Sequence, residues 1–233
     1  VEAKALGHGP AAFGVDGGRM TANVASDINR LYDVDRSEII WESHERAAFL
    51  AVASPSDGWI LRLACATGLR AADLVAIPRS ADKGYRFVFK TSKTGKSVII
   101  PILPDARAVL DEIAAAFPQP ADAPTDLQAP ILRGAKGRPI TAQTAGEKIT
   151  ATCDKLISAG IMDERKHLHD CRGSFATELM LSGATDDEAA ELLGWETARI
   201  KKIRRRYVDG KAVAGAIVER LEAYRRTKQN RDA

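Results

Sequence analysis

The chain has 233 residues, of which 45% are hydrophobic and 28% are charged, and its formal net charge is +3. This composition is typical of a globular protein of one or two domains with a sizeable core. The sequence contains no apolar run long enough to span a membrane and no recognisable signal peptide, and its small net charge does not by itself indicate a nucleic-acid partner.

The first 36 residues differ from the rest of the chain. Glycines recur between residues 7 and 18, and no long amphipathic period precedes Asn23. This pattern predicts an arm, or the remnant of a linker to another domain, rather than a folded unit.

Helical periodicity begins at Trp41. Ser43 is expected to cap a helix whose apolar residues lie on spaced turns: Ala47, Phe49, Leu50 and Val52. The stretch from Trp59 to Ala66 predicts a buried helix that is broken at Gly68.

The period then changes to that of a β-hairpin. Residues 85–90 alternate in polarity, Thr94-Gly95 is typical of a turn, and residues 97–101 predict a second strand, so Lys93 should lie near the hairpin tip. Further helices are expected at 106–117 (opened by Pro104), 141–158, 169–182, 186–193, 197–207 and 212–226. The predicted fold is therefore mainly α with a small antiparallel β-sheet.

Three cysteines, Cys65, Cys153 and Cys171, form an odd set with no CxxC spacing. Each lies among apolar or helical residues, so we expect buried thiols in a reducing compartment, the cytoplasm.

Several short motifs stand in a suggestive order. His169-Asp170-Cys171-Arg172-Gly173 is followed by Gly194-Trp195 and then by Tyr207, while Arg70 (after Gly68-Leu69) and Lys93 (before Thr94-Gly95) lie upstream. Taken singly, a surface arginine, a core histidine, a core tryptophan or a hairpin lysine is more often structural than functional. Together they form a set suited to holding a phosphodiester while a phenol oxygen attacks it.

In their order and context these motifs resemble those of the tyrosine recombinases, the phage-integrase family, over roughly residues 41–224. The resemblance implies a catalytic-domain-like fold for residues 37–233. It also implies the following catalytic residues: Arg70, Lys93, His169, Arg172, Trp195 and Tyr207.

Each implied role has a chemical reason. The planar guanidinium groups of Arg70 and Arg172 match phosphate oxygens bidentately, and Asp73 is expected to orient Arg70. The family places a general-acid lysine in the hairpin turn, which Lys93 matches better than Lys96, because the 5′-oxygen leaves poorly unless it is protonated. The Trp195 indole is only a donor, so we assign it a positioning role.

Tyr207 is the expected nucleophile, because it alone of the four tyrosines follows Gly194-Trp195 within a basic helix. The gap from Trp195 to Tyr207 exceeds the family's commonest gap by about one helical turn. From Arg199 to Arg206, six of eight residues are Lys or Arg, a run that is either a solvated helix face or a DNA contact. The expected DNA-binding residues are Lys96, Arg199, Lys201, Lys202, Arg204, Arg205 and Arg206.

The resemblance implies a site-specific recombinase or integrase of a phage or integrative element, which acts on double-stranded DNA as a tetrameric synapse through a 3′-phosphotyrosyl link. It implies no cofactor and no metal, and the sequence offers no carboxylate cluster for two-metal chemistry. The family usually has a separate helical DNA-binding domain, for which residues 1–36 are too short. We therefore expect either a truncated chain or a member that lacks this domain.

Two alternatives remain open at this point. One is a nicking-closing enzyme resembling type IB topoisomerases, which would use the same residues. The other is a catalytically degenerate relative that binds DNA and regulates recombination, as the long gap before Tyr207 would favour.

Overall fold

The computed structural model describes residues 39–92, 95, 97–118, 126–208, 214–215, 217–219, 221–222 and 225–226. The predicted arm, its boundary near residue 36, and two of the candidate site residues, Lys93 and Lys96, lie outside the described residues. In the described part of the chain, no helix is both long enough and apolar enough to cross a membrane.

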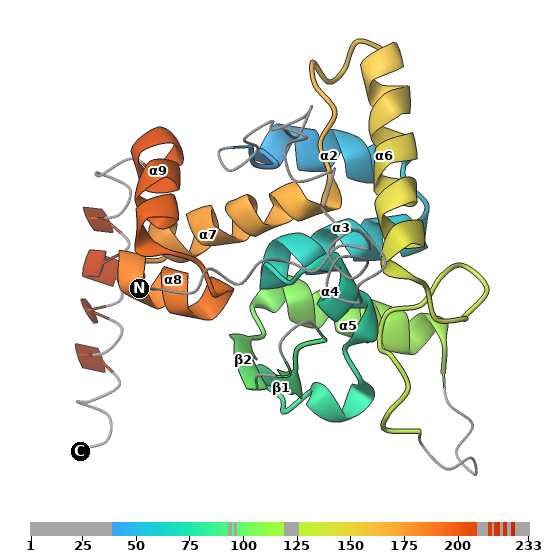
Figure 1. The fold of residues 1–233 in the computed structure, drawn as a ribbon, viewed down its shortest axis with the longest axis horizontal. Coiled ribbons are helices and arrows are strands. Elements are labelled where there is room, and N and C mark those ends of the chain that lie inside the picture. The colour runs from blue at the N-terminus through green and yellow to red at the C-terminus, as the bar shows by residue number, and fades with distance from the viewer. Residues whose placement is uncertain are drawn as a thin grey trace, which may run out of the picture. The chain divides into compact units, whose positions relative to one another are not determined.

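The described residues form a mainly helical fold with one two-stranded antiparallel sheet, as predicted (Figure 1). The elements are α2 (Ser43–Val52), α3 (Pro55–Thr67), α4 (Ala71–Ala76), η1 (Arg79–Ala81), β1 (Arg86–Lys90), β2 (Ser97–Pro101), α5 (Pro104–Ala116), α6 (Ala142–Ser158), η2 (Leu168–Asp170), α7 (Cys171–Leu181), α8 (Asp186–Leu193) and α9 (Thr197–Tyr207).

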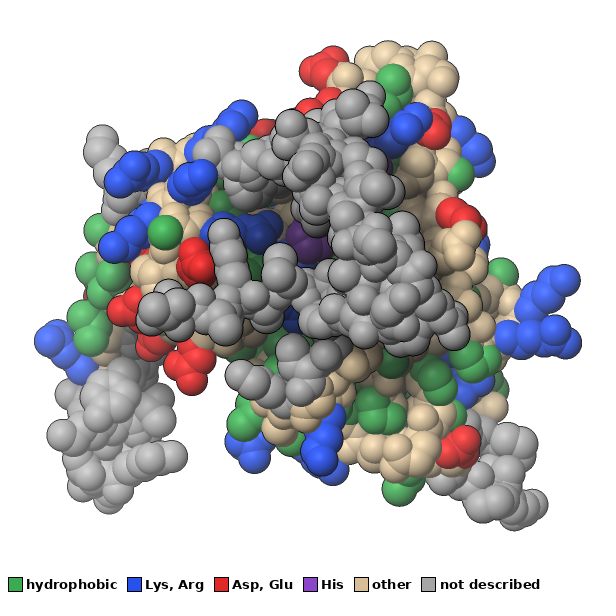
Figure 2. Space-filling view, in the orientation of Figure 1, with side chains coloured by type: hydrophobic (Ala, Val, Ile, Leu, Met, Phe, Trp, Pro, Cys, Tyr) green, Lys and Arg blue, Asp and Glu red, His purple; other side chains and the backbone are tan. Residues whose placement is uncertain are grey.

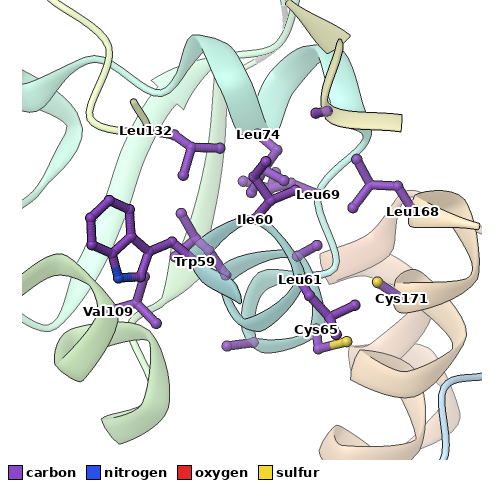
Figure 3. Close-up of a cluster of buried hydrophobic side chains, with 14 of the residues drawn as sticks. Trp59, Ile60, Leu61, Cys65, Leu69, Leu74, Val109, Leu132, Leu168 and Cys171 are labelled. Atoms are coloured by element: carbon purple, nitrogen blue, oxygen red, sulfur yellow. The ribbon is translucent and has the colours of Figure 1, made fainter. Parts of the chain in front are cut away.

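Helix α3 runs through the main hydrophobic core. Ser54 caps its first turn by accepting a hydrogen bond from the Asp57 N–H at 3.3 Å, and Pro55 follows at the first helical position. Nearly every later residue of the helix is buried, and Figure 3 shows side chains of α3 among those of α4, α5 and α7. Gly68 ends the helix with φ +60°, as its sequence position predicted.

Helix α2 differs from the prediction in its cap and its buried face. Glu42, not Ser43, is the N-cap residue, and its N–H donates to the Glu45 carboxylate at 2.8 Å. Phe49 is buried, but Leu50 and Val52 are exposed. The periodic apolar residues therefore did not identify the buried face of α2. The buried residues of this helix are the charged Glu45 and the apolar Phe49, which lie one turn apart.

The β-hairpin matches the prediction to within one residue. Strands β1 and β2 pair antiparallel, with Phe87 opposite Ile100, and both of these side chains are buried. This pairing places the inward face of the hairpin on the core. The two strands are joined by residues 91–96, so the connection that carries Lys93 begins directly after β1.

A second hydrophobic cluster is formed by α7, α8 and α9, which lie together in Figure 1. Thr185 caps α8 by accepting from the Glu188 N–H at 3.2 Å, and Gly194 ends it with φ +60°. Helix α9 buries Ile200 and Ile203 against this cluster. The junction between the two clusters lies at the start of α7, where Cys171 belongs to one and Phe175 to the other.

Gly68 is expected to tolerate no side chain. A Cβ there would lie 2.4 Å from Phe175 Cδ1 and 2.8 Å from Leu193 Cδ2, and its φ of +60° is unfavourable for other residues. Gly68→Ala should therefore lower the free energy of unfolding by about 1–3 kcal/mol. The control is Gly146→Ala in the interior of α6, where a Cβ meets nothing within 4 Å. It should be neutral or stabilising in urea denaturation; an equal loss in both variants would contradict this account.

Candidate active site

Arg172 lies at the centre of the site, in the first turn of α7. Its side chain is buried, with 3% of the residue exposed. Nη1 donates to the Gly68 carbonyl at 2.6 Å and Nη2 to the Leu193 carbonyl at 2.5 Å. Arg172 therefore ties the turn after α3 to the end of α8, across the junction of the two hydrophobic clusters.

The third nitrogen of the Arg172 guanidinium, Nε, donates to neither of these carbonyls. Nε of Arg172 is buried and has no hydrogen-bond partner among the described residues. Burial, together with the charges of Arg70 and Arg199, lowers the pKa of Arg172 to about 10, so the group remains a cation at neutral pH. A buried cation with an unused donor is costly unless an acceptor completes it, and an anionic oxygen would do so.

Arg70 and His169 belong to the same cluster of charges. Arg70 is the N-cap residue of α4 and is half-buried. Its positive charge lowers the pKa of Arg172 and that of His169, so the three groups lie near one another. His169 lies in the 3-10 turn η2 rather than in the α-helix predicted there, and α7 begins two residues later.

The imidazole of His169 is held neutral by its surroundings. Desolvation by neighbouring protein atoms, followed by the charges of Arg172 and Arg199, lowers its pKa below the ordinary value. As pH falls below about 6.5, the unfolded chain therefore takes up a proton that the folded chain does not.

This pKa shift predicts a pH-dependent stability. The contribution of His169 is fully present above its ordinary pKa and is lost as pH falls toward the lowered folded value. His169→Gln removes the titration, so the variant should lose less stability than the parent protein between pH 7.5 and pH 5.5. Urea denaturation at the two pH values measures this difference. Equal losses in the two proteins would show that His169 does not titrate as described.

The ring of Trp195 makes cation–π contacts with two guanidinium groups. Cζ of Arg199 lies 3.8 Å and Cζ of Arg172 lies 5.1 Å from the centroid of its ring, both within cation–π range. Trp195 is half-buried and follows the left-handed Gly194, and its backbone N–H donates to the Ala190 carbonyl at 2.9 Å. The structure thus brings Trp195 to the arginine cluster, together with Arg199.

Asp73 makes its hydrogen bonds to the residue at the start of the hairpin connection and not to Arg70. Its carboxylate is buried and accepts two hydrogen bonds from Ser92, from the backbone N–H at 2.7 Å and from Oγ at 2.8 Å. Among the described residues, Arg70 makes no hydrogen bond to it. The structure therefore does not support the expected role of Asp73 in orienting Arg70. Instead, Asp73 fixes the residue that precedes Lys93.

Tyr207 lies apart from this cluster. It ends α9 and faces an open cavity of about 430 Å³ that is also lined by Ser174, Thr177 and Leu181 of α7. The lining of this cavity includes none of Arg70, Arg172 and Arg199, and the Tyr207 ring also packs against the hydrophobic cluster of α7, α8 and α9. Burial raises its pKa, so the phenol is protonated here at neutral pH.

The basic residues of α9 fall into two groups. Lys201, Lys202, Arg205 and Arg206 are exposed, and Figure 2 shows blue side chains gathered over α9 at the upper left. Arg204 instead pairs with Asp186 at 2.6 Å and donates to the Ala184 carbonyl, which ties α9 to α8. The exposed group presents positive charge at the surface, and Arg204 holds α9 against α8.

Several contributors to the site were not foreseen. The carbonyls of Gly68 and Leu193, the Ser92 anchor and the stacking of Arg199 on Trp195 are absent from the sequence prediction. Of these residues, only Arg199 has a functional role predicted from the sequence, as a DNA contact within the basic run. The described residues contain no group of three or more His, Cys, Asp or Glu that could hold a metal ion.

Comparison with solved structures gives the fold a clear context. A lambda integrase dimer bound to a COC′ core site matches with a TM-score of 0.60 and 20% identity, over 84% of this chain and 57% of that chain. A lambda integrase tetramer bound to a Holliday junction matches at 0.59 and 21%, over 80% and 54%. The Tn1549 transposon integrase in complex with transposon right end DNA matches at 0.55 and 15%, over 85% and 70%.

These matches show the tyrosine-recombinase catalytic-domain fold, and the chain spans somewhat more than half the length of the lambda integrase chain. No curated protein matches the chain in sequence. The sequence model of the phage integrase family, however, matches residues 26–211. This match covers well over half of the chain and contains every candidate site residue, and the chain therefore belongs to the phage integrase family.

Proposed function

We propose that this protein is a site-specific recombinase that cleaves and rejoins double-stranded DNA through a covalent link between Tyr207 and a 3′-phosphate. The observation that carries the proposal is the buried cation at Arg172, whose Nε–H has no partner among the described residues. Arg70 and Arg199 surround it with further positive charge, so the site is built to receive an anion.

The proposed reaction needs no group beyond the chain itself. The phenol oxygen of Tyr207 forms a bond to phosphorus, and the bond from phosphorus to the 5′-oxygen breaks. Arg70 and Arg172 bind the non-bridging oxygens and stabilise the charge that develops on them. The neutral His169 is available to accept the phenol proton, and Lys93 is proposed to protonate the departing 5′-oxygen. The reverse reaction with another 5′-hydroxyl rejoins the strand.

The position of Tyr207 adds a requirement. Because Tyr207 lines a cavity to which Arg70, Arg172 and Arg199 do not contribute, we propose that the end of α9 moves before the phenol reaches a phosphate held by the arginines. Ile200 and Ile203 hold the middle of the helix and Arg204 ties the start of its last turn to Asp186, so we propose that the movement is confined to Tyr207 and its immediate neighbours.

The expected partners follow from the family and from the solved relatives. Lambda integrase is seen as a dimer on a core site and as a tetramer on a Holliday junction, and the Tn1549 integrase is seen with transposon end DNA. We propose duplex DNA as the substrate, a tetramer as the synaptic assembly, a phage or integrative element as the source and the cytoplasm as the location. We also propose that residues 37–233 form the catalytic domain.

One observation favours a second candidate, the catalytically degenerate regulator. Tyr207 lines a cavity to which Arg172 does not contribute, as it would in a relative that binds DNA without cutting it. The intact arginine cluster argues against this reading, because a pure binding protein has no need to bury an incomplete cation.

Adduct formation with a suicide substrate tests the proposal. A duplex carrying the element's attachment site is nicked near the cleavage position, so that the short 5′-hydroxyl fragment is lost and the covalent complex accumulates. We expect a covalent protein–DNA band in denaturing gels. Binding without adduct would support the regulator. Relaxation of a plasmid without joining of two sites would support the topoisomerase-like alternative.

Adduct formation should also be independent of divalent metal. Arginine and lysine supply the positive charge that metal ions supply in other phosphoryl transfers. Excess EDTA should therefore leave the yield and rate of the adduct unchanged. Loss of the adduct in EDTA, with recovery on adding magnesium, would contradict the proposed mechanism.

A further inference from the structure

Arg199 differs from the other basic residues of α9 in its position. Lys201, Lys202 and Arg205 lie on the exposed face, opposite Ile200 and Ile203. Arg199 lies at the border of the packed face and is half-buried. A location at this border turns its guanidinium toward the body of the protein instead of toward bulk solvent.

The guanidinium of Arg199 is stacked closely on Trp195. Its Cζ is 3.8 Å from the ring centroid, shorter than the 5.1 Å of Arg172 to the same ring. The negative face of the indole attracts cations and partly offsets the repulsion between them. One aromatic ring thus collects two of the three arginines whose charges meet at this site.

The backbone of the junction between α8 and α9 positions both Trp195 and Arg199. Gly194 ends α8 in the left-handed region, and Glu196 is the N-cap of α9, so Trp195 and Arg199 flank a sharp junction between two helices. The Arg199 N–H donates to the Glu196 carbonyl at 3.0 Å, and the Leu193 carbonyl accepts from Arg172. The same junction therefore positions both Arg172 and Arg199.

We infer that Arg199, stacked on Trp195, is a third guanidinium of the phosphate site, where it binds a non-bridging oxygen of the scissile phosphate beside Arg172. This inference rests on the proposed function. It separates Arg199 from the exposed residues of α9, which meet DNA phosphates elsewhere. Its effect on the cluster is already visible without DNA, because its charge lowers the pKa of both Arg172 and His169.

A matched pair of variants on one helix tests the inference. Arg199→Ala and Arg205→Ala each remove one positive charge, and each is expected to weaken DNA binding. On DNA present at saturating concentration, Arg199→Ala should slow adduct formation about 100-fold, the usual cost of one lost donor to a transition-state oxyanion. Arg205→Ala should be at least tenfold faster than Arg199→Ala under these conditions. Equal rates would overturn the inference.

A second substrate separates phosphate binding from simple support of Trp195. In a methylphosphonate duplex, one non-bridging oxygen at the scissile position is replaced by an uncharged methyl group. If Arg199 offsets that negative charge, the defect of Arg199→Ala relative to the parent protein should largely disappear on this substrate. A defect of the same size on both substrates would show that Arg199 only supports the fold.

The variant Arg199→Lys and the parent protein serve as controls that make the outcomes distinct. Arg199→Lys keeps the charge and the cation–π contact but not the planar fork, so its rate should lie between those of the parent and Arg199→Ala. It serves in place of Arg199→Ala if thermal unfolding shows that the alanine variant is not folded. Absence of adduct with the parent protein on the ordinary duplex would refute the proposed function itself, whereas normal adduct with Arg199→Ala would refute only the role of Arg199.

Discussion

Tyr207→Phe should abolish the covalent protein–DNA complex while leaving the fold and the affinity for DNA close to those of the parent protein. The change removes only the phenol oxygen, which is the proposed attacking atom. The ring, which packs against the cluster of α7, α8 and α9, is kept. The adduct on a nicked suicide duplex and the binding curve on an intact duplex are the two measurements.

Tyr85→Phe is the matched control for this substitution. Tyr85 is 69% exposed and precedes β1, away from the arginine cluster, so the same loss of a hydroxyl group there should not affect the adduct. If Tyr207→Phe still forms a covalent complex at the parental rate, another residue is the nucleophile, and the assignment made from the motif order is wrong.

Arg172→Lys should have the next largest effect. Lysine keeps the charge, but its donors are on one compact nitrogen and cannot replace the separate Nη1, Nη2 and Nε positions that serve the Gly68 carbonyl, the Leu193 carbonyl and a phosphate. Cleavage on saturating DNA should fall about 100- to 1,000-fold, as for loss of one preorganised donor to a developing oxyanion. Unfolding should become easier by about 1–3 kcal/mol for each buried carbonyl left without a donor.

Arg62→Lys on α3 controls for the chemical change itself. Arg62 donates to both carboxylate oxygens of Glu112 at 2.7 and 2.8 Å on the partly exposed side of α3, far along the helix from Gly68. Both bonds come from Nη1, so Arg62→Lys changes the guanidinium to an ammonium at a partly exposed salt bridge, which should cost little stability and should not change the cleavage rate. A cleavage rate for Arg172→Lys close to that of Arg62→Lys would rule out the clamp.

The sequence predicted local structure well where that structure depends on residues adjacent in the chain. Gly68 and Gly194 end helices α3 and α8 in the left-handed region, and the hairpin strands lie within one residue of their expected bounds. These features depend on neighbouring residues alone. The prediction of the α2 cap and buried face was wrong, because burial there is set by what packs on the helix from distant parts of the chain.

The candidate site shows the same division. Motif order predicted that Arg70, His169, Arg172 and Trp195 would come together, and the structure places them in one cluster. Sequence could not foresee that Arg172 is held by two backbone carbonyls, since any residue supplies a carbonyl. Nor could it foresee that Tyr207 lines a cavity to which the three arginines do not contribute, because the direction in which the end of α9 faces depends on tertiary packing.

The central claim is that Tyr207 attacks a phosphate held by the arginine cluster. The most direct test is to trap the covalent complex with the nicked suicide duplex, digest it with a protease, and identify the peptide that carries the nucleotide by mass spectrometry. We expect a single modified peptide with the phosphate linked to Tyr207. A covalent link at Tyr224 or at any other residue, or specific DNA binding with no link at all, would contradict it.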